Sequence, residues 1–303
     1  MPRIPEWIRL KWKADSDFAK VHQLIGGHGL HTVCQSARCP NIHECWGAGT
    51  ATIMLLGNLC TRSCAFCSVP HGRPEALDLA EPRRVAAMLP GMDVRHLVMT
   101  SVNRDDQPDG GAAIFAETIR LCREAVPGLT IEVLTPDFEG NRAAAECIFS
   151  AHPDVFSHNV ETVRRMQAVI RPQASYGRSL EVLRWASEWR PKMAVKSGLM
   201  VGLGETDEEL RETMQDLYDA GCRILTLGQY LQPTRHNRPV QRYVVPRLFD
   251  TYAAWAKEIG FDGVASGPMV RSSYKADELF RSVLERDAEL ASAYPDRIPA
   301  PLS

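Results

Sequence analysis

The stretch Ala51-Thr-Ile-Met-Leu-Leu-Gly57-Asn-Leu-Cys60-Thr-Arg-Ser-Cys64-Ala-Phe-Cys67 joins an apolar run to three cysteines within eight residues. The run 51–57 is typical of a buried strand, so the cysteines lie on the loop that leaves its carboxyl end. In barrel-type α/β folds this end of the sheet holds the active site. The stretch therefore indicates both the kind of fold and the place of its chemistry.

The spacing of Cys60, Cys64 and Cys67 suits an iron–sulfur cluster. A [4Fe–4S] cubane normally takes four thiolates, so three cysteines leave one iron open. An open metal position separates catalytic sites from closed structural ones, and such an iron could chelate an amine and a carboxylate. Two alternatives remain: a thioredoxin-like pair of Cys64 and Cys67, which leaves Cys60 unused, and a zinc site with a fourth ligand elsewhere.

A second cysteine triad precedes this stretch. Cys34, Cys39 and Cys45 fall within twelve residues, and this spacing lets three thiolates converge on one site. A zinc site with His43 as the fourth ligand is one interpretation. A second iron–sulfur cluster is the other.

From residue 51 onward, strand-like and helical patterns alternate. Six such units imply a parallel sheet with right-handed crossovers, two short of a closed barrel. We expect an α/β fold, a partial (β/α)6 TIM-type barrel whose open side is left for a large substrate; a doubly wound sheet is the alternative. The predicted domains are an N-terminal extension with the first triad, the barrel, and a C-terminal extension that closes it, at 1–50, 51–240 and 241–303.

The expected elements are these. Strands are predicted at 51–57, 96–101, 130–135, 155–159, 194–201 and 223–230, and helices near 81–90, 112–126, 140–151, 161–170, 178–190 and 206–220. Further helices are expected near 15–25, 246–259 and 277–292.

Composition narrows the class of protein. The 303 residues are 45% hydrophobic and 24% charged with a net charge of −2, so nothing global suggests nucleic acid or an anionic membrane as partner. No apolar run approaches the roughly 20 residues of a membrane span, and the N-terminus lacks the h-region of a signal peptide. Six of nine cysteines lie between 34 and 67, which favours metal binding over disulfides. We expect a cytoplasmic protein in which Cys122, Cys147 and Cys222 are small core residues.

The Cys60 loop, with the aromatic Phe66 before its last cysteine, resembles the signature of the radical S-adenosylmethionine (SAM) superfamily. The resemblance implies reductive cleavage of SAM to a 5′-deoxyadenosyl radical that abstracts hydrogen from an unactivated C–H bond. Polar residues that follow the predicted strands on the same rim are then candidate SAM contacts: Asn103, Asp105, Asn159, Glu161, Arg171 and Lys196.

Further motifs resemble the lipoyl synthase family, from about residue 30 to 276. They are Cys34-x4-Cys39-x5-Cys45, the Cys60 loop, Ser101-Val-Asn-Arg-Asp-Asp106 with Gly110-Gly111, and Arg271-Ser-Ser-Tyr274. That family inserts two sulfurs, at C6 and C8, into an octanoyl chain amide-linked to a lysine of a lipoyl carrier domain. The chain departs from the family at Arg171-Pro-Gln-Ala174, where Gln173 stands in place of the usual glycine.

The resemblance implies a role for each triad. Cys60, Cys64 and Cys67 would bind the SAM cluster, and Cys34, Cys39 and Cys45 an auxiliary [4Fe–4S] cluster that is consumed as the sulfur source. Ser273 would be the fourth auxiliary ligand; an oxygen suits iron less well than a thiolate and should leave more easily. Capping of the helix near 276 is the alternative role for Ser272 or Ser273.

The implied partners are the octanoylated lipoyl carrier domain as protein substrate, an electron donor such as flavodoxin or ferredoxin, and an iron–sulfur carrier for cluster repair.

Three alternative functions can be compared with this one. A methylthiotransferase would need additional domains, for which about fifty residues before the first strand leave no room, and biotin synthase lacks the N-terminal triad. A zinc-stabilised binding module is the non-enzymatic alternative.

Overall fold

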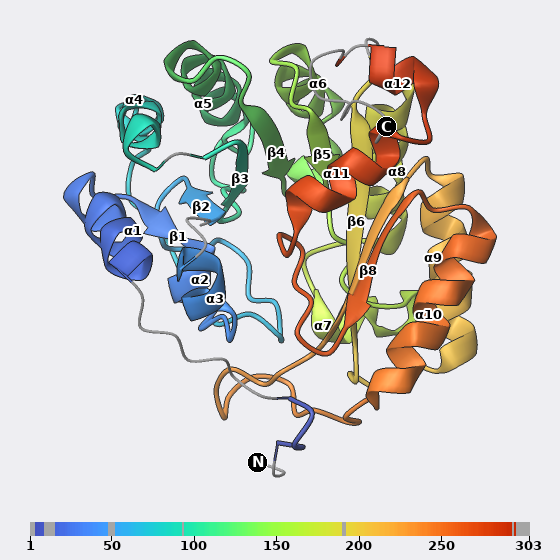
Figure 1. Ribbon diagram of the computed structural model, residues 1–303. Coiled ribbons are helices and arrows are strands. Elements are labelled where there is room, and N and C mark those ends of the chain that lie inside the picture. Colours follow the sequence, from blue (N-terminus) through green and yellow to red (C-terminus); the bar gives the residue numbers. More distant parts are fainter. Residues whose placement is uncertain are drawn as a thin grey trace.

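The computed structural model describes residues 4–8, 16–47, 52–92, 94–189, 192–292 and 294. Its centre is an eight-stranded sheet in which the strands follow the order of the sequence (Figure 1). The strands are β1 (His31–Thr32), β2 (Thr52–Leu55), β3 (His96–Ser101), β4 (Thr130–Leu134), β5 (Val155–Ser157), β6 (Ala194–Val201), β7 (Ile224–Gln229) and β8 (Gly263–Gly267). Only the β1–β2 pair is antiparallel. The sheet stays open among the described residues, so the predicted partial barrel is confirmed.

The six strands expected from the apolar runs are β2 to β7. The structure adds β8, a seventh parallel strand that pairs with β7 and lies in the segment predicted as a C-terminal extension. Its sequence, Gly263-Val-Ala-Ser-Gly267, has two glycines and one branched residue, so its propensity for a strand is weak. Pairing with β7, and not local preference, makes it a strand.

Helices cover the outer face of this sheet (Figure 1). They are α4 (Glu81–Met88), α5 (Ala112–Ala125), α6 (Arg142–Ser150), α7 (Gln167–Ile170), α8 (Tyr176–Glu188), α9 (Asp207–Asp219) and α10 (Pro246–Ile259), with short 3-10 turns at Leu89–Gly91, Phe138–Gly140 and Arg164–Met166. Helix α9 begins at a capping box in which Thr206 and Glu209 satisfy each other's backbone N–H groups. Towards the termini lie α1 (Ser16–Gly27), α2 (Val33–Ser36), α3 (Ile42–Gly47), α11 (Ala276–Leu284) and α12 (Ala288–Ser292).

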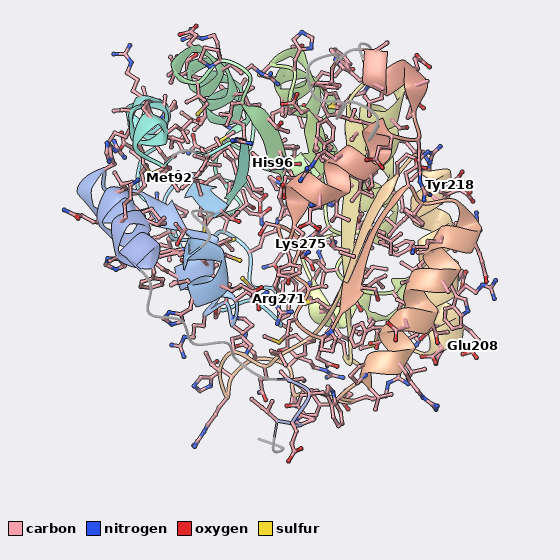
Figure 2. All side chains as sticks on the ribbon, in the orientation of Figure 1. Met92, His96, Glu208, Tyr218, Arg271 and Lys275 are labelled. Carbon is pink, nitrogen blue, oxygen red and sulfur yellow. The ribbon has the colours of Figure 1, made fainter. Side chains whose placement is uncertain are left out.

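Helix α11 closes the amino end of the barrel. Its side chains Leu279, Phe280 and Val283 form an apolar cluster with Val155, Ala194 and Ile224, which start β5, β6 and β7. The ring of His96, at the start of β3, meets Phe280 at a centroid distance of 6.4 Å, and Figure 2 shows His96 beside this helix. The amino end is therefore packed shut, which leaves the carboxyl end for a ligand.

The side opening between β2 and β8 is also filled, by two segments of the chain itself. The amide of Asn41 donates to the carbonyl of Met269 (2.6 Å), and the Tyr274 hydroxyl donates to Glu44 (3.4 Å). The Thr52 hydroxyl, at the start of β2, donates to Ser273 (2.9 Å). Residues 33–47 and 268–275 thus lie side by side across the gap that we expected to stay open for a large substrate.

The scattered cysteines follow the prediction in part. Cys122 and Cys222 are buried, but Cys147 is exposed. Cys147 lies on α6, where the neighbouring apolar positions Ile148 and Phe149 face the core instead.

Candidate active site

The Cys60 loop is held from three sides at the carboxyl end of the sheet. Its backbone bonds the chain after β3 through Thr61 N–H to the Asn103 carbonyl (3.1 Å) and the end of α7 through Ala65 N–H to Ile170 (2.9 Å). From the loop after β7, the Asn237 amide donates to the Cys67 carbonyl (2.8 Å). These contacts hold the loop against the segment after β3, the end of α7 and the loop after β7.

The thiol of Cys60 already receives hydrogen bonds of the kind that cluster sulfurs accept. The backbone N–H groups of Arg62 and Asn103 donate to its Sγ atom at 3.4 and 3.3 Å. Burial is the main cause that raises the pKa of Cys64 to about 11 and that of Cys67 to about 12, and the other two thiols of the triad contribute to the rise at Cys67. Because a metal ligand must be the thiolate, this site needs the charge of a bound group to ionise.

Two buried arginines, Arg62 and Arg104, hold the Cys60 loop against the neighbouring strand ends. Arg62, whose side chain is 3% exposed, pairs with Asp105 (2.8 Å) and with Asp137 (2.7 Å), and Arg62 holds the pKa of Asp137 at about 2 despite its burial. Arg104 donates to the carbonyls of Leu56 (3.4 Å) and Glu75 (2.8 Å), at the two ends of the loop. Each guanidinium thus ties the cysteine loop to a neighbouring strand end.

The second triad lies on α2, α3 and the turn between them. Cys34 is buried, and Cys39 and Cys45 are half-buried. Burial, together with the nearby Cys39 and Cys34 thiols, raises the pKa of Cys45 to about 12. Cys34 and Cys39 line the same cavity.

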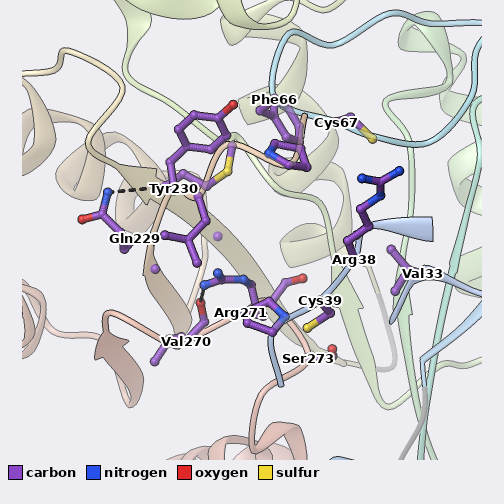
Figure 3. A pocket seen from close by; sticks show the side chains of 18 of the residues that line it. Val33, Arg38, Cys39, Phe66, Cys67, Gln229, Tyr230, Val270, Arg271 and Ser273 are labelled. Carbon is purple, nitrogen blue, oxygen red and sulfur yellow. Dashed lines mark hydrogen bonds between the residues drawn. The ribbon is translucent and has the colours of Figure 1, made fainter. Parts of the chain in front are cut away.

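Arg271 and Ser273 reach this triad from the C-terminal segment. The Arg271 guanidinium donates to the Val270 carbonyl (2.6 Å), and its charge favours the thiolate form of Cys39. Figure 3 shows Cys39, Arg271 and Ser273 together at one end of a cavity, with Phe66 and Cys67 at the other end. The cavity therefore lies between the two cysteine triads.

This cavity has a volume of about 520 Å³, within the range of small-molecule sites. Cys34, Cys39 and Ser273 line one side, and Cys67 the other. The inner wall comes from the barrel strands, with Asn159, Glu161, Gly198, Met200, Thr226 and Gly228. A molecule in this space would contact both triads at once.

Of the six predicted SAM contacts, Asn159 and Glu161 line the cavity. The Asn159 amide donates to Glu161 (3.1 Å), while its Oδ1 atom has no partner among the described residues. Burial raises the pKa of the Glu161 carboxyl, and Arg171 opposes this rise. Arg171 itself lies behind the wall and donates to the Val160 carbonyl (3.0 Å).

The other three predicted contacts lie outside the lining and already have partners. The Asn103 amide lies 3.8 Å from the Cys60 sulfur, and the Asp105 carboxylate binds Thr61 and Arg62. Lys196 is fully buried inside the barrel, 2.7 Å from Glu132. Asn103 and Asp105 therefore support the cysteine loop. Lys196 shares its partner Glu132 with His96, inside the barrel near the amino ends of the strands.

Sequence reasoning missed several lining residues, including Arg38, Thr226, Gly198 and Gly228. The two glycines could have been recognised as site residues, because a glycine inside a strand often marks a place where a ligand or another backbone segment comes close to the strand. A Cβ atom at Gly198 would lie 2.8 Å from the Asn159 and Thr226 oxygens, and one at Gly228 would lie 2.2 Å from the Val270 carbonyl. Arg38 carried no such signal.

The residues present fit two iron–sulfur clusters. Cys34 and Cys39 of one triad, Cys67 of the other and the orphaned Asn159 oxygen line the cavity, and backbone N–H groups donate to the Cys60 sulfur beside it. Within the described chain, no three His, Cys, Asp or Glu side chains converge closely enough to hold a single metal ion. A cubane places each thiolate on a different iron, so its ligands need not converge on one point.

Comparison with known proteins defines the class first. Residues 54–217 match the model of the radical SAM superfamily. Among solved structures, the fold is similar to that of HydG, a maturase of the [FeFe]-hydrogenase (TM-score 0.57, 15% identity, 76% of this chain and 54% of that chain). It is also similar to methylornithine synthase (TM-score 0.50, 15% identity, 75% and 71%). The chain is thus a radical SAM protein, a class that uses SAM and [4Fe–4S] clusters.

The curated relatives narrow this class. The chain is 54% identical to the lipoyl synthase of Rubrobacter xylanophilus over 274 residues, 90% of this chain and 85% of that protein. It is 50% identical to that of Thermus thermophilus over 284 residues, 93% and 88%. The chain belongs to the lipoyl synthase family, whose members insert sulfur into a protein-bound octanoyl group and need an electron donor. Within the described residues, no helix is long and apolar enough to cross a membrane.

Proposed function

We propose that the two triads divide the reaction between them, across one shared cavity. Cys60, Cys64 and Cys67 would hold a [4Fe–4S] cluster, which when bound would supply the electron for reductive cleavage of SAM to the 5′-deoxyadenosyl radical. Cys34, Cys39, Cys45 and Ser273 hold the auxiliary cluster that supplies the two sulfurs for C6 and C8 of the octanoyl chain. The observation that carries the proposal is the cavity itself, which is lined by Cys67 on one side and by Cys34, Cys39 and Ser273 on the other.

The chain's own residues orient the reactants. The Asn159 oxygen and the Glu161 carboxylate face the cavity and can accept hydrogen bonds from the SAM amine or ribose. Arg171, Asn103 and Asp105 act indirectly, by holding the wall and the cysteine loop. Lys196 forms a buried ion pair with Glu132 inside the barrel.

The substrate is the octanoylated lysine of a lipoyl carrier domain, with flavodoxin or ferredoxin as the donor and an iron–sulfur carrier that rebuilds the auxiliary cluster. Free octanoate lacks the amide and the peptide contacts that position the chain, and positioning accounts for much of the rate of such reactions. The need for reduced, oxygen-sensitive clusters supports the cytoplasm as the location.

The test combines composition with turnover. Protein prepared without oxygen should be brown, contain about eight irons from two [4Fe–4S] clusters, and convert an octanoyl-lysine peptide to the dithiolated product in single turnover. Colourless, zinc-loaded protein would support the binding module instead. Efficient use of free octanoate in competition with the peptide would contradict the proposed substrate.

A further inference from the structure

The cavity opens at Arg38. Among the residues that line it, Arg38 is the exposed one, while the others are buried or half-buried. It adopts a left-handed backbone conformation (φ 50°) in the turn between Cys34 and Cys39. Figure 3 shows its guanidinium between Cys67 and Cys39. A long substrate therefore passes Arg38 on its way to the clusters.

A rigid turn borders the same opening from the loop after β7. Leu231, Gln232 and Pro233 line the cavity, and the next residues form the turn 234–237. In this turn the Thr234 hydroxyl donates to the Asn237 side chain (2.6 Å), and the Gln232 amide donates to the Asn237 carbonyl (2.8 Å). Asn237 in turn holds Cys67. The tip, Arg235 and His236, is exposed beside the cysteine loop.

The two segments at this opening are basic. Neither segment, 33–43 or 230–245, contains an Asp or Glu. Together they contain four arginines, Arg38, Arg235, Arg238 and Arg242, although the whole chain has a net charge of −2. Arg242 pairs with Asp207 (2.8 Å). The side chains of Arg38 and Arg235 form no ion pair or hydrogen bond with the residues that the structure describes. Arg38 lines the cavity and Arg235 lies two residues beyond the lining residue Pro233, so two exposed arginines without an ion-pair partner among the described residues lie at or next to the entrance.

From this we infer that Arg38 and Arg235 form a docking surface for an acidic face of the protein that carries the octanoyl-lysine. The inference rests on the proposed function, because a protein-bound chain that reaches the clusters must bring its carrier against this entrance. Exposed charges of one sign accelerate the encounter with an oppositely charged partner and weaken with salt. An electron donor needs only to approach the cluster, whereas the carrier has to sit at the opening.

The test compares two substrates with the intact holoenzyme and dithionite as reductant. One is an octanoylated carrier protein with acidic residues around its lysine, and the other is a neutral blocked tripeptide with octanoyl-lysine in the middle. Arg235→Glu should raise KM for the carrier protein about tenfold and flatten its dependence on salt, because a charge at an interface rim acts mainly on encounter. The KM for the tripeptide should stay within about twofold of the wild type, and Arg235→Lys should restore the carrier KM.

The matched control is Arg184→Glu, an exposed arginine on α8, which should leave both KM values unchanged. An unchanged carrier KM in Arg235→Glu, or an equal rise for both substrates, overturns the docking surface. So does a loss confined to flavodoxin-driven turnover, because the surface would then serve the donor. If the wild type thiolates neither substrate, the proposed function is wrong. If the wild type thiolates both substrates and Arg235→Glu has the same KM values, only the docking surface is wrong.

Discussion

At the scale of single residues, Ser273 links the two ends of the chain. Its hydroxyl accepts from Thr52 at the edge of the sheet, and it lines the cavity with Cys34 and Cys39. Helix α11 begins at Ala276, and Lys275 at its N-cap makes no side-chain capping bond. Because Ser273 faces the triad and not the helix N-terminus, the ligand role is favoured over capping.

Ser273→Ala should therefore leave the Cys60 cluster intact and make the auxiliary cluster labile, with a fall of at least tenfold in lipoyl product. Iron content and Mössbauer spectra of both clusters check this, and Ser272→Ala is the matched control. Product formation at the wild-type rate in Ser273→Ala would remove Ser273 from the ligand set.

Gln173 is a second residue whose position explains a departure from the family pattern. Its side chain accepts from Ser63 N–H (3.3 Å) and donates to the Ser63 hydroxyl (3.2 Å) in the cysteine loop. The turn Arg171–Ala174 has no positive φ at this position, so it does not require glycine. A glutamine here can thus brace the loop.

Gln173→Gly should accelerate loss of the Cys60 cluster to a chelator severalfold, because two hydrogen bonds of about 1 kcal/mol or less are removed from an exposed loop. The decay of the visible absorbance measures the rate. Ser63→Ala removes only the bond from the Gln173 amide to the Ser63 hydroxyl and should have a smaller effect, and the double variant should add little to Gln173→Gly. Additive effects in the double variant would show that the two side chains act independently.

At the scale of elements, the ends of parallel strands are tied together by buried charge. Arg62 on the loop after β2 binds Asp105 after β3 and Asp137 after β4. The Asp137 side chain is fully buried and that of Asp105 is 23% exposed. The two carboxylates should therefore differ in their contribution to stability.

Asp137→Asn should lower the free energy of unfolding by about 3 kcal/mol, because it leaves the buried guanidinium of Arg62 less compensated and also removes the charge that pairs with the half-buried Arg178. Asp105→Asn should cost about 1 kcal/mol, as expected for a partly solvated pair. Urea denaturation of the anaerobic protein measures both. Equal losses would show that burial does not set the strength of this network.

His158, directly after β5, gives the fold a dependence on pH. Burial lowers its pKa to about 4, and its ring nitrogens contact the Thr135 carbonyl and the Ser179 hydroxyl at 2.9 Å. Since the unfolded chain binds a proton near pH 6.5, the stability from neutral His158 is present above that pH and is lost as pH falls towards 4. Between pH 7.5 and 5.5 the loss should be about 1 kcal/mol.

Urea denaturation of the cluster-free chain at the two pH values checks this difference, with His158→Gln as the comparison. The variant should lack this part of the pH dependence. The same pH dependence in both proteins would mean that His158 is protonated in the fold.

Strands and helices with clear patterns were predictable at this scale. Local sequence is enough to identify these elements: the apolar runs mark β2 to β7, and the capping box marks the start of α9. β8 was not predictable, because its glycines and small residues form a strand only through pairing with β7. The roles of Asp105 and Lys196 also depend on distant partners, Arg62 and Glu132, which no local spacing reveals.

At the scale of the whole molecule, the N-terminal and C-terminal segments complete the barrel. Residues 33–47 and 268–275 fill the side opening and place Cys34, Cys39 and Ser273 opposite Cys67. The cysteine spacing predicted two metal groups, but only the fold shows that one cavity is lined by cysteines of both triads. Under the proposed division of roles, this arrangement would let a radical made at one triad act on a chain that lies within reach of the other.

The most direct test of this division compares the two sets of cysteine variants in one assay. Cys60→Ala, Cys64→Ala and Cys67→Ala should form no 5′-deoxyadenosine, because SAM loses its anchor and its electron source. Cys34→Ala, Cys39→Ala and Cys45→Ala should still form 5′-deoxyadenosine with reductant and octanoyl peptide, yet attach no sulfur. Chromatography of the nucleoside and mass spectrometry of the peptide measure both. Loss of 5′-deoxyadenosine in the second set, with the Cys60 cluster intact by spectroscopy, or any lipoyl product from it, would contradict the account.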